Sequence, residues 1–463
     1  MKDRKIRTGE AEARDQPTGR RGANGLQPRI GYACIAIGVP GTELRTCQAA
    51  RATPQLLDEL VAHNLRSLGR MLDWNARNGI RLFRVSSDLI PFGSSPVNRL
   101  PWWETHADAF AALAEKARAA GIRLSMHPGQ YTVLNAKDPD IVRRAVDDLV
   151  YHERVLSLLG QGPEGKIILH AGGVYGDRKA ALQRFADAWR HLDDCVRARL
   201  VIENDEKCHP IADVLALGTK LGIPVVYDNL HNAILPSDPA RTDADWIAAC
   251  APTWRAADGR QKIHYSQQAQ GKAPGAHAAT IEPEAFLSYV RALSDGAVPA
   301  AATAAPDARL APVDPLPDIM LEVKDKNLSA VKCALCLAGT GVMRALEHQW
   351  ARYKYTVLEH APNTYLQIRK LLSDKTASPA LAFHKLVDEA LAEPVTAGNA
   401  ENAALHVWGY FKDKASSQER STFDRAIARL RATGSPAAAK RVLLSLAQTH
   451  ADAYLLDSLY FFL

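Results

Sequence analysis

The chain has 463 residues, of which 47% are hydrophobic and 23% charged, a globular composition long enough for two or three folded units. It has no apolar run long enough to cross a bilayer and no apolar segment near its first residue, so we expect neither a membrane span nor a secretory signal. Its seven scattered cysteines, an odd number, argue against a disulfide framework and favour a reducing, cytoplasmic location.

The net charge of +6 is unevenly distributed along the chain. Residues 1–29 hold eight Lys and Arg against four Asp and Glu, and residues 341–463 hold 15 against 12. Residues 30–340 hold 34 against 35, so the largest segment is nearly neutral. Charge alone therefore does not indicate a nucleic-acid binder, because neutralising phosphates needs a surplus of Lys and Arg.

Residues 1–28 are basic and lack periodicity, so we expect a disordered arm. After them, short apolar runs alternate with amphipathic stretches of helical period. The eight candidate strands are 29–37, 80–86, 122–127, 166–170, 198–203, 224–228, 262–266 and 318–323. The intervening helical stretches include 55–78, 105–120, 138–160, 178–195 and 210–221. Eight successive strand-then-helix units predict an α/β fold, a (β/α)8 TIM barrel over residues 29–335.

Two later segments depart from this pattern. Residues 294–317 carry eight Ala and five Pro and no apolar stripe, which predicts a flexible insertion before the eighth strand. Past residue 341 the strand signals stop, and helical periodicity covers 342–390 and 416–459, with Gly, Pro and Asn mostly in a connection at 392–409. We therefore predict a separate all-α domain over residues 341–463.

Side chains that bind metals mark six successive predicted strands. In chain order they are His127, His170, Glu203, Asp228, His264 and Glu322. In a TIM barrel these strand ends meet at the carboxyl-terminal face, where three carboxylates would repel one another without cations. His231 and His277, from the following loops, extend the set. Histidines and carboxylates without cysteine predict two or three divalent ions such as Mn²⁺ or Zn²⁺.

Such a cluster suits two kinds of chemistry. Clustered divalent ions hydrolyse phosphodiesters by activating a water and holding the phosphate, and they isomerise sugars by polarising adjacent oxygens. The ligands alone do not separate a nuclease from a sugar isomerase or epimerase of the xylose-isomerase-like barrels.

Nine short motifs form a collinear series over about residues 29–330. They are GYAC (31–34), SSDLIPF (86–92), SMHPGQY (125–131), LHAGG (169–173), IENDE (202–206), VVYDNLHNA (225–233), KIHYSQQ (262–268), PGAH (274–277) and MLEVKDK (320–326). The series resembles the UV damage endonuclease family, whose fold is a TIM barrel similar to endonuclease IV. The resemblance implies a DNA repair endonuclease that nicks double-stranded DNA immediately 5′ of cyclobutane dimers and 6-4 photoproducts, and often of abasic sites. It implies up to three ions, usually Mn²⁺, with Zn²⁺, Mg²⁺ or Co²⁺ as alternatives, on the eight ligands above.

The resemblance also assigns roles to single residues. Glu203, Lys262 and His231 would act in catalysis, and Lys262 matches a lysine that can be carboxylated near the metals; unmodified, it would be a cation facing the phosphate. Two positions depart from the family: Ser95 stands where some members have a histidine, and Ala36 where an asparagine is common.

Three further residues match positions that contact the damaged DNA. Gln130 and Tyr131 match a pair that wedges into the duplex opposite the lesion, and Tyr32 matches a residue of the damage pocket. An aromatic ring and an amide fit the gap that a flipped-out dimer leaves, and a damaged step costs less to unstack.

The C-terminal part, through residues 350–372 and 401–420, resembles a YbgA-type domain of unknown function. We expect its aromatic residues to form a core rather than a base-stacking platform. Cys333 and Cys336 form a single CxxC pair, a weak signal for zinc or redox chemistry.

The interpretation is a monomeric, metal-dependent DNA repair endonuclease of the cytoplasm or nucleoid, with no membrane partner. Two alternatives remain besides the nuclease. One is the sugar isomerase, and the other is a non-catalytic protein that binds damaged DNA, which the departures from the family pattern at Ser95 and Ala36 allow. Two or three divalent ions would turn the nearly neutral barrel mouth positive, so we expect DNA affinity to fall when metals are removed.

Overall fold

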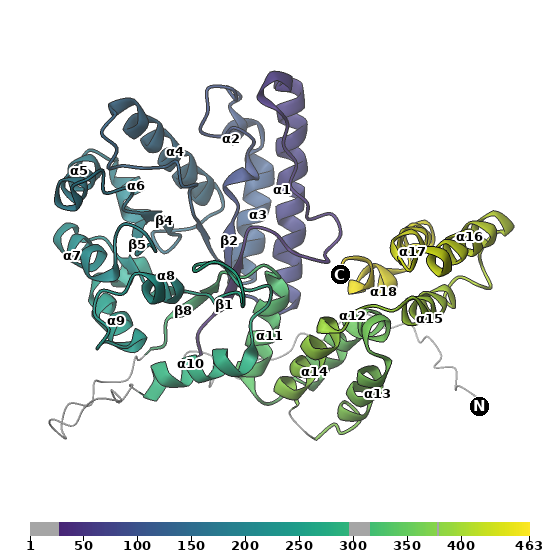
Figure 1. Cartoon of the computed structure of the whole chain (residues 1–463). Helices are drawn as coiled ribbons and strands as arrows, with labels where there is room; N and C mark the ends of the chain where they lie inside the picture. Colours follow the sequence, from purple (N-terminus) through teal and green to yellow (C-terminus); the bar gives the residue numbers. More distant parts are fainter. Residues whose placement is uncertain (1–26, 296–314, 377–378) are drawn as a thin grey trace.

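The computed structural model describes residues 27–295, 315–376 and 379–463 (Figure 1). The expected arm, residues 1–28, and the expected insertion, residues 294–317, lie almost wholly outside these ranges. The first two residues of that insertion end helix α10 (Pro283–Asp295), and residues 315–317 lead into strand β8 (Asp318–Leu321).

Eight parallel strands form the predicted barrel, so the fold class is confirmed. They are β1 (Ile30–Ala33), β2 (Leu82–Val85), β3 (Arg123–Met126), β4 (Ile167–His170), β5 (Leu200–Glu203), β6 (Val225–Val226), β7 (Lys262–Tyr265) and β8 (Asp318–Leu321). Their order in the sheet is β6-β5-β4-β3-β2-β1-β8-β7. Between β6 and β7 the barrel is joined by a parallel bridge between Asp228 and His264, where the His264 N–H donates to the Tyr227 carbonyl at 2.9 Å.

Every residue of β1, β3, β5, β7 and β8 is buried, as expected for a parallel sheet that is covered by helices and filled by its own side chains. Around the strands lie α1 (Pro54–Arg77), α2 (Trp102–Thr105), α3 (Ala107–Ala119), α4 (Pro139–Leu158), α5 (Arg178–Arg190), α6 (Asp194–Arg199), α7 (Ile211–Leu221), α8 (Asn229–Ile234), α9 (Asp243–Cys250), α10 and α11 (Asn327–Ala338).

Helix α1 shows how local sequence sets the ends of these elements. The Thr53 side chain accepts a hydrogen bond from the Leu56 N–H, and Pro54 occupies the first helical position, which needs no N–H donor. Gly79, with φ of 74°, turns the chain after the helix toward β2. The end of α1 therefore lies at the amino-terminal end of the strands, opposite the predicted ligands.

Charged residues close this amino-terminal end of the barrel. Arg123, only 5% exposed, donates to Asp318 Oδ2 at 3.1 Å and to the carbonyls of Asp258 at 2.8 Å and Glu164 at 2.9 Å. Lys166 pairs with Asp258 at 2.5 Å. Buried charges persist only when paired and hydrogen-bonded, and this network satisfies that condition.

The C-terminal region is all helical, as predicted. Its helices are α12 (Met343–His360), α13 (Pro362–Leu371), α14 (Ala380–Ala392), α15 (Ala397–Trp408), α16 (Ser417–Thr433), α17 (Ala437–Thr449) and α18 (Ala453–Leu456). The prediction of a connection at 392–409 is wrong, because α15 fills most of it: the Thr396 side chain caps the helix by accepting from the Asn399 N–H. No helix of the described ranges is long and apolar enough to span a bilayer.

The helical region packs against the barrel through α12. Arg352 of this helix is 1% exposed and donates to the carbonyls of Gly38 and Asp457, each at 3.2 Å. Lys332 of α11 pairs with Asp388 of α14 at 2.7 Å. Charged side chains from both parts of the chain are therefore buried in one interface.

Candidate metal centre

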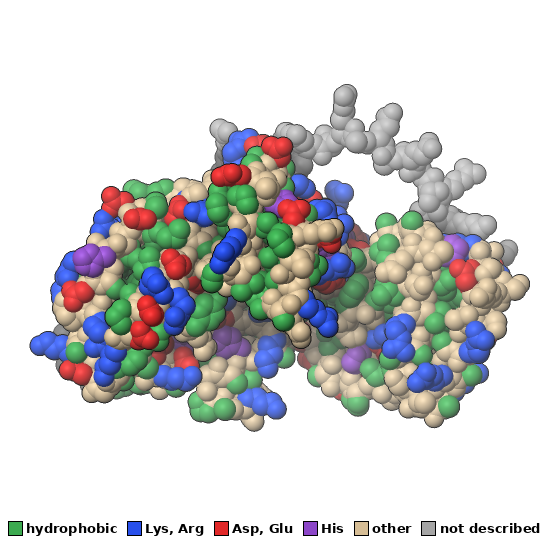
Figure 2. Space-filling view, turned by 90° about the horizontal axis from the view of Figure 1, so that it is seen from above, with side chains coloured by type: hydrophobic (Ala, Val, Ile, Leu, Met, Phe, Trp, Pro, Cys, Tyr) green, Lys and Arg blue, Asp and Glu red, His purple; other side chains and the backbone are tan. Residues whose placement is uncertain are grey.

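The predicted ligands meet at the carboxyl-terminal face of the barrel, which Figure 2 shows from above as a hollowed surface with histidine side chains in the hollow. His170 and Glu203 are the last residues of β4 and β5 and are paired across the two strands. His127 and Glu322 directly follow β3 and β8, and Asp228 follows β6 after one residue. The strand ends therefore deliver side chains to one place, as predicted.

Glu203 lies at the centre of the cluster and is 1% exposed. Its Oε2 lies 3.3 Å from His127 Nε2 and 3.8 Å from His170 Nε2. Its Oε1 lies 2.7 Å from His264 Nδ1 and 3.8 Å from His231 Nδ1. The two carboxylate oxygens thus face two different sets of histidines.

Two groups in the described part of the chain have the geometry to hold a metal ion, and both include Glu203. One joins Glu203 to His127 and His170, and the other joins it to Asp228 and His264, with the ligand atoms of each group within 4.8 Å of one another. A carboxylate shared between two groups is typical of a centre with more than one divalent ion.

Several buried polar atoms in these groups have no hydrogen-bond partner in the protein. They are Asp228 Oδ2, His264 Nε2 and His170 Nδ1. An unpaired buried polar atom is costly, so such atoms call for a water or an ion. The donor set of imidazole nitrogens and carboxylate oxygens fits a borderline-to-hard divalent cation.

Backbone carbonyls orient two of the histidines. His127 Nδ1 lies 3.0 Å from the Pro128 carbonyl, and His231 Nδ1 lies 2.9 Å from the Asn204 carbonyl. Donation from Nδ1 fixes the ring and leaves Nε2 unprotonated for a metal, the arrangement usual for metal-binding histidines. His231 Nε2 lies 3.5 Å from Oε2 of Glu206, which was not among the predicted site residues.

The charges of the cluster shift its pKa values in opposite directions. Burial would raise the pKa of Glu203, but His264, His127 and His170 hold it well below its usual value. Burial raises the pKa of Asp228 to about 7. Burial opposes the charge on His231, yet the nearby Asp228 and Glu203 raise its pKa to about 9. Without cations, Asp228 and His231 therefore retain protons near neutral pH.

His277 lies at the edge of the cluster rather than inside either group. A bridge to Gln268 places it in the loop after β7, and it is half-buried. Burial lowers its pKa, against the nearby Glu322 carboxylate. Its position is compatible with a ligand that completes the site from the loop side.

Two basic side chains, Lys262 and Arg84, lie near the carboxylates. Lys262 precedes His264 by two residues on β7, so both side chains share the inner face of the strand. Lys262 is 1% exposed, and burial, with Arg123 and Arg84 nearby, holds its pKa well below the usual value. Arg84 of β2 pairs with Glu322 at 2.5 Å.

Arg84 was not among the predicted site residues, although an arginine within the apolar run LFRV is an unusual residue that could have pointed to it. Burial would lower the pKa of Arg84, but Glu322 more than offsets this effect and the pKa is raised. The guanidinium therefore stays charged and fixes the Glu322 carboxylate beside the cluster.

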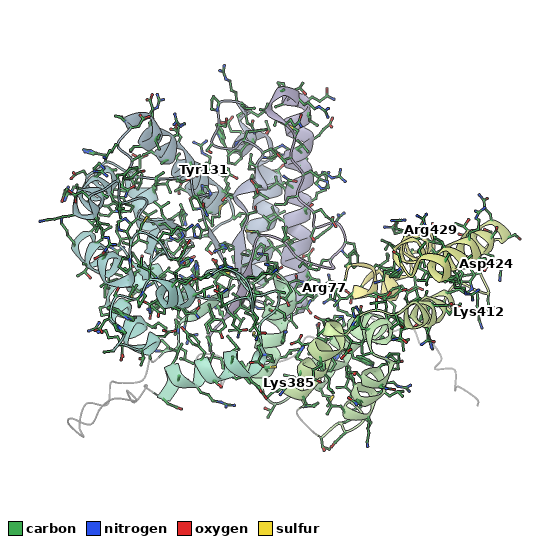
Figure 3. The ribbon with its side chains drawn as sticks, in the orientation of Figure 1. Arg77, Tyr131, Lys385, Lys412, Asp424 and Arg429 are labelled. Carbon is green, nitrogen blue, oxygen red and sulfur yellow. The ribbon has the colours of Figure 1, made fainter. Side chains whose placement is uncertain are left out.

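Tyr131 projects from the rim of the same face. Its side chain is 69% exposed, more than any other large hydrophobic side chain of the described residues (Figure 3). Gln130 lines a cavity of about 200 Å³ together with His127, His170 and Lys207. One member of the metal groups, His127, and the exposed ring of Tyr131 thus lie on the same loop, which joins β3 to α4.

This loop is anchored from below. Thr132, 3% exposed, donates from Oγ1 to Asp148 Oδ2 of α4 at 2.6 Å, and Ser94 donates to the other carboxylate oxygen at 2.7 Å. Ser87 Oγ donates to the His127 carbonyl at 2.9 Å. These bonds hold the residues around Tyr131 while the ring itself stays free.

Comparison with known proteins assigns the family. The family described as UV-endonuclease UvdE matches residues 28–354. The chain belongs to this family. The UV DNA damage endonuclease of Clostridium perfringens (strain 13 / Type A) is 33% identical over 403 residues, which cover 86% of this chain and 92% of that protein. A UV-damage endonuclease of Neurospora crassa is 32% identical over 285 residues, 59% of this chain and 40% of that protein.

A solved crystal structure supports the same family assignment. The crystal structure of SacUVDE is 33% identical, with a TM-score of 0.59 and coverage of 67% of this chain and 98% of that one. Endonuclease IV from Thermus thermophilus is also similar, at 16% identity and a TM-score of 0.42 over 67% of this chain and 98% of that one. A second family, described as a protein of unknown function (DUF1722), matches residues 354–463. The expectation that the C-terminal part resembles a different family from the barrel is therefore confirmed.

The positions singled out by the UvdE resemblance lie in different surroundings. Tyr32 is fully buried, and its hydroxyl donates to Asn75 Oδ1 at 2.8 Å, so the structure places it in the barrel core and not on the open face. Ser95 and Tyr131 line one cavity of about 650 Å³. Ala36 is largely buried and lines a separate cavity of about 470 Å³.

Proposed function

We propose that this UvdE-family enzyme is a metal-dependent endonuclease that nicks double-stranded DNA immediately 5′ of cyclobutane pyrimidine dimers, 6-4 photoproducts and abasic sites. The observation that carries the proposal is the pair of candidate metal groups that share Glu203, together with the exposed Tyr131 on the loop that also carries His127. A hydrolytic centre and a projecting aromatic ring on one face suit a substrate that must be unstacked before it is cut.

The centre would hold two or three divalent ions, with Mn²⁺ as the preferred ion. His127, His170, Glu203, Asp228, His231, His264, His277 and Glu322 would be the ligands. When bound, such ions activate a water and stabilise negative charge on the phosphate. Two groups that share one carboxylate, and unpaired buried atoms in both, support this assignment.

The protein's own residues prepare the site for a phosphodiester. Glu203 presents one oxygen to each histidine set and keeps its negative charge because its pKa is low. Arg84 holds Glu322 in place, and Lys262 adds a second nitrogen beside the ligands. His231 is oriented by the Asn204 carbonyl and its side chain is partly exposed, so it would be able to exchange a proton with solvent.

Gln130 and Tyr131 would form the wedge that enters the duplex. A damaged step costs less to unstack than an intact one, so insertion of a ring favours lesions without reading sequence. The anchored loop beneath Tyr131 keeps the ring extended before DNA arrives.

We further propose that the enzyme acts as a monomer on the nucleoid, in the cytoplasm, with the barrel over residues 29–335 and the helical domain over 341–463. The described cysteines are all free, which fits a reducing compartment.

The test is a nicking assay on ultraviolet-irradiated and unirradiated plasmid, with Mn²⁺ or with EDTA. Wild-type protein nicks only irradiated plasmid and only with metal. Glu203→Gln lowers the rate at least about 100-fold because both metal groups lose their shared ligand. Glu115→Gln, which changes an exposed carboxylate on α3, serves as the matched control and keeps the rate.

Damage-dependent nicking that persists in EDTA would contradict the metal centre. Binding to irradiated DNA without any cutting would instead favour the damage-binding alternative. Removal of metal should also weaken DNA binding, because it removes positive charge from the face that carries Tyr131.

A further inference from the structure

The helical domain contacts the barrel close to the loop that carries His277. Helix α11 begins shortly after β8, so its first turns lie at the same end of the barrel as the candidate ligands. Lys332, in the second turn of α11, is 3% exposed. Its ammonium group donates to Thr280 Oγ1 at 2.6 Å and to Asp388 of α14, at 2.7 Å from Oδ2 and 2.9 Å from Oδ1. One buried cation therefore joins the segment after His277 to the helical domain.

The Lys332 ammonium has three N–H donors, and these two residues satisfy all three of them. A buried ammonium is tolerated only when it is paired and fully hydrogen-bonded. Asp388 supplies the opposite charge, and Thr280 supplies the remaining acceptor. The position of the Thr280 side chain is therefore linked to a carboxylate that belongs to the other part of the chain.

The segment that contains Thr280 leads back to two candidate ligands. His277 precedes Thr280 by three residues in the chain. Two backbone hydrogen bonds, of 3.2 Å and 3.0 Å, join residues 324–325 to residues 278–279. Glu322 lies just before the first of these stretches, and His277 lies just before the second. A shift of Thr280 would therefore be transmitted to the backbone beside both ligands.

A second contact binds the same segment to α11. The Ile281 N–H donates to Ser329 Oγ at 2.9 Å, and both residues are fully buried. Helix α11 thus holds the segment at two adjacent positions. The bond to Ser329 is made within the barrel alone, whereas the bond from Lys332 to Thr280 depends on Asp388 of the helical domain.

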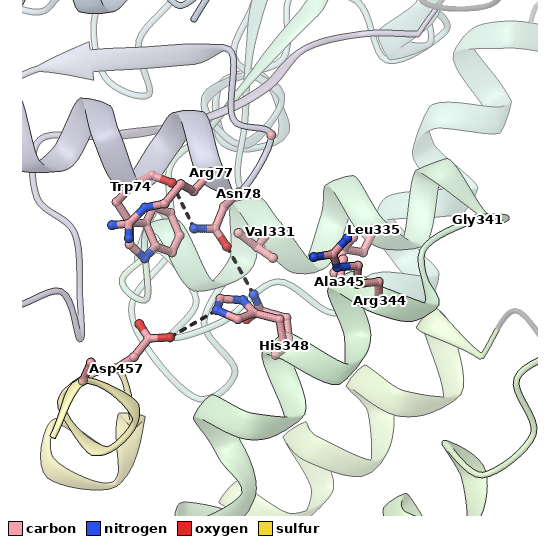
Figure 4. Close-up of a pocket in the computed structure, with 13 residues that line it drawn as sticks. Trp74, Arg77, Asn78, Val331, Leu335, Gly341, Arg344, Ala345, His348 and Asp457 are labelled. Atoms are coloured by element: carbon pink, nitrogen blue, oxygen red, sulfur yellow. Dashed lines mark hydrogen bonds and ion pairs between the residues drawn. The ribbon is translucent and has the colours of Figure 1, made fainter. Parts of the chain in front are cut away.

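The two parts of the chain pack less closely on the other side of α11. A cavity of about 810 Å³ lies there between the end of α1, α11 and the start of α12 (Figure 4). Val331 lines it, and beside it Gln349 donates to Asn78 Oδ1 at 3.4 Å. The contact between Lys332 and Asp388 is shorter and charged, so it is the stronger of these two polar links.

We propose that Asp388 is a positioning residue for the metal centre: through Lys332 and Thr280, the helical domain holds the His277 loop in place for a divalent ion. This role rests on the proposed assignment of His277 as a ligand. Loss of the Asp388 charge would release Thr280 and let the His277 loop move away from the other ligands, so the ion that His277 binds would be held less tightly. Residues 341–463 would then support the reaction without touching DNA.

The test is a titration of the metal-loaded full-length protein with a chromogenic chelator, which reports the affinity of each bound Mn²⁺ ion. His277→Ala identifies the ion concerned, because it weakens that ion by about tenfold. Asp388→Asn weakens the same ion by about fivefold, since it removes the charge that holds Lys332. Glu389→Gln, at the exposed neighbouring position of α14, is the matched control and changes each affinity by less than about twofold.

A double-mutant cycle shows whether Asp388 acts through His277. With both His277→Ala and Asp388→Asn, the affected ion binds within about twofold of His277→Ala alone, because the loop no longer carries a ligand to be positioned. Additive losses would show that Asp388 supports only the fold, and would overturn the proposal. Equal affinities in wild type, Asp388→Asn and Glu389→Gln would overturn it as well.

A further variant separates positioning from stability, because removing one partner of a buried ion pair can unfold a protein. Lys332→Met combined with Asp388→Leu replaces both charges with apolar side chains and keeps the unfolding temperature of wild type. Thr280 still loses its donor, so the affected ion stays about fivefold weaker. Wild-type affinity in this variant would overturn the proposal. A wild-type protein that binds no Mn²⁺ would instead contradict the proposed metal centre itself, and with it the role of Asp388.

Discussion

Asp228 and His231 hold protons that a metal ion must displace. Asp228 has a pKa of about 7 through burial, and His231 a pKa of about 9 because its carboxylate neighbours outweigh burial. Glu203 is already ionised, since its pKa is lowered. Only the first two groups therefore compete with the ion near neutral pH.

The metal-free protein is accordingly expected to bind Mn²⁺ more tightly as the pH rises through about 7 and on towards about 9. The sign follows from the raised pKa values, because both groups are protonated below them. Competition with a chromogenic chelator across this range measures the affinity. An affinity that is constant, or that falls with rising pH, would contradict the protonation of Asp228 and His231 in the metal-free site.

Substitution of Thr132 would test whether the loop that carries Tyr131 must be anchored to α4 for binding of irradiated DNA. Thr132→Val keeps the shape and removes the bond to Asp148, worth about 1 kcal/mol, so KM for irradiated DNA should rise about fivefold. The turnover number and the bound metal stay unchanged. Thr433→Val, at the exposed end of α16, is the control. A lower metal content in Thr132→Val would show that the loop supports the ligands instead.

At the scale of elements, the strands were predictable because each is a short apolar run followed by a polar ligand or a turn. The helical connection at 392–409 was not, because Gly398 and Asn399 suggest a loop in isolation. In the structure they occupy the first turn after the Thr396 cap, where such residues cost little. The period over 342–390 similarly concealed the break at Pro362 between α12 and α13.

The candidate site was predictable where its residues lie at the ends of predictable strands. The strand ends identify the candidate ligands His127, His170, Glu203 and Asp228 directly, since parallel strands bring their carboxyl ends together. The burial of Tyr32 was not predictable, because an inward or outward direction depends on how the barrel closes and not on the motif.

The network at the amino-terminal end of the barrel offers a stability test. Arg123→Met leaves the Asp318 carboxylate, which has no solvent exposure, without its nearest cation, and should lower the free energy of unfolding by about 3–5 kcal/mol. Urea denaturation measures the loss. In the double variant with Asp318→Leu, most of it should be recovered, because the buried charge is gone. No recovery would mean that Arg123 acts through its carbonyl partners.

At the scale of the whole molecule, α12 joins the two parts of the chain. Arg352 bonds to Gly38 of the barrel and to Asp457 near the C-terminus, so one side chain connects segments more than 300 residues apart. The helical domain is therefore held by buried polar contacts as well as by apolar packing.

Arg352→Met should lower the free energy of unfolding by about 2 kcal/mol, since it removes charge-assisted bonds while preserving bulk. It should also separate the unfolding of the barrel from that of the helices. Calorimetry of the full chain would show one transition in wild type and two in the variant. Arg429→Met, at an exposed position, is expected to keep the single transition. A single transition at unchanged temperature in Arg352→Met would place the coupling elsewhere.

The barrel closes at the candidate metal centre. β6 has only two residues, and its link to β7 runs through Asp228 and His264, which are also ligands of one metal group. A divalent ion bound by Asp228 and His264 would therefore also link β6 to β7 where the barrel closes. The barrel closure and the proposed metal centre thus share Asp228 and His264, so removal of the ions should also weaken the contact that closes the barrel.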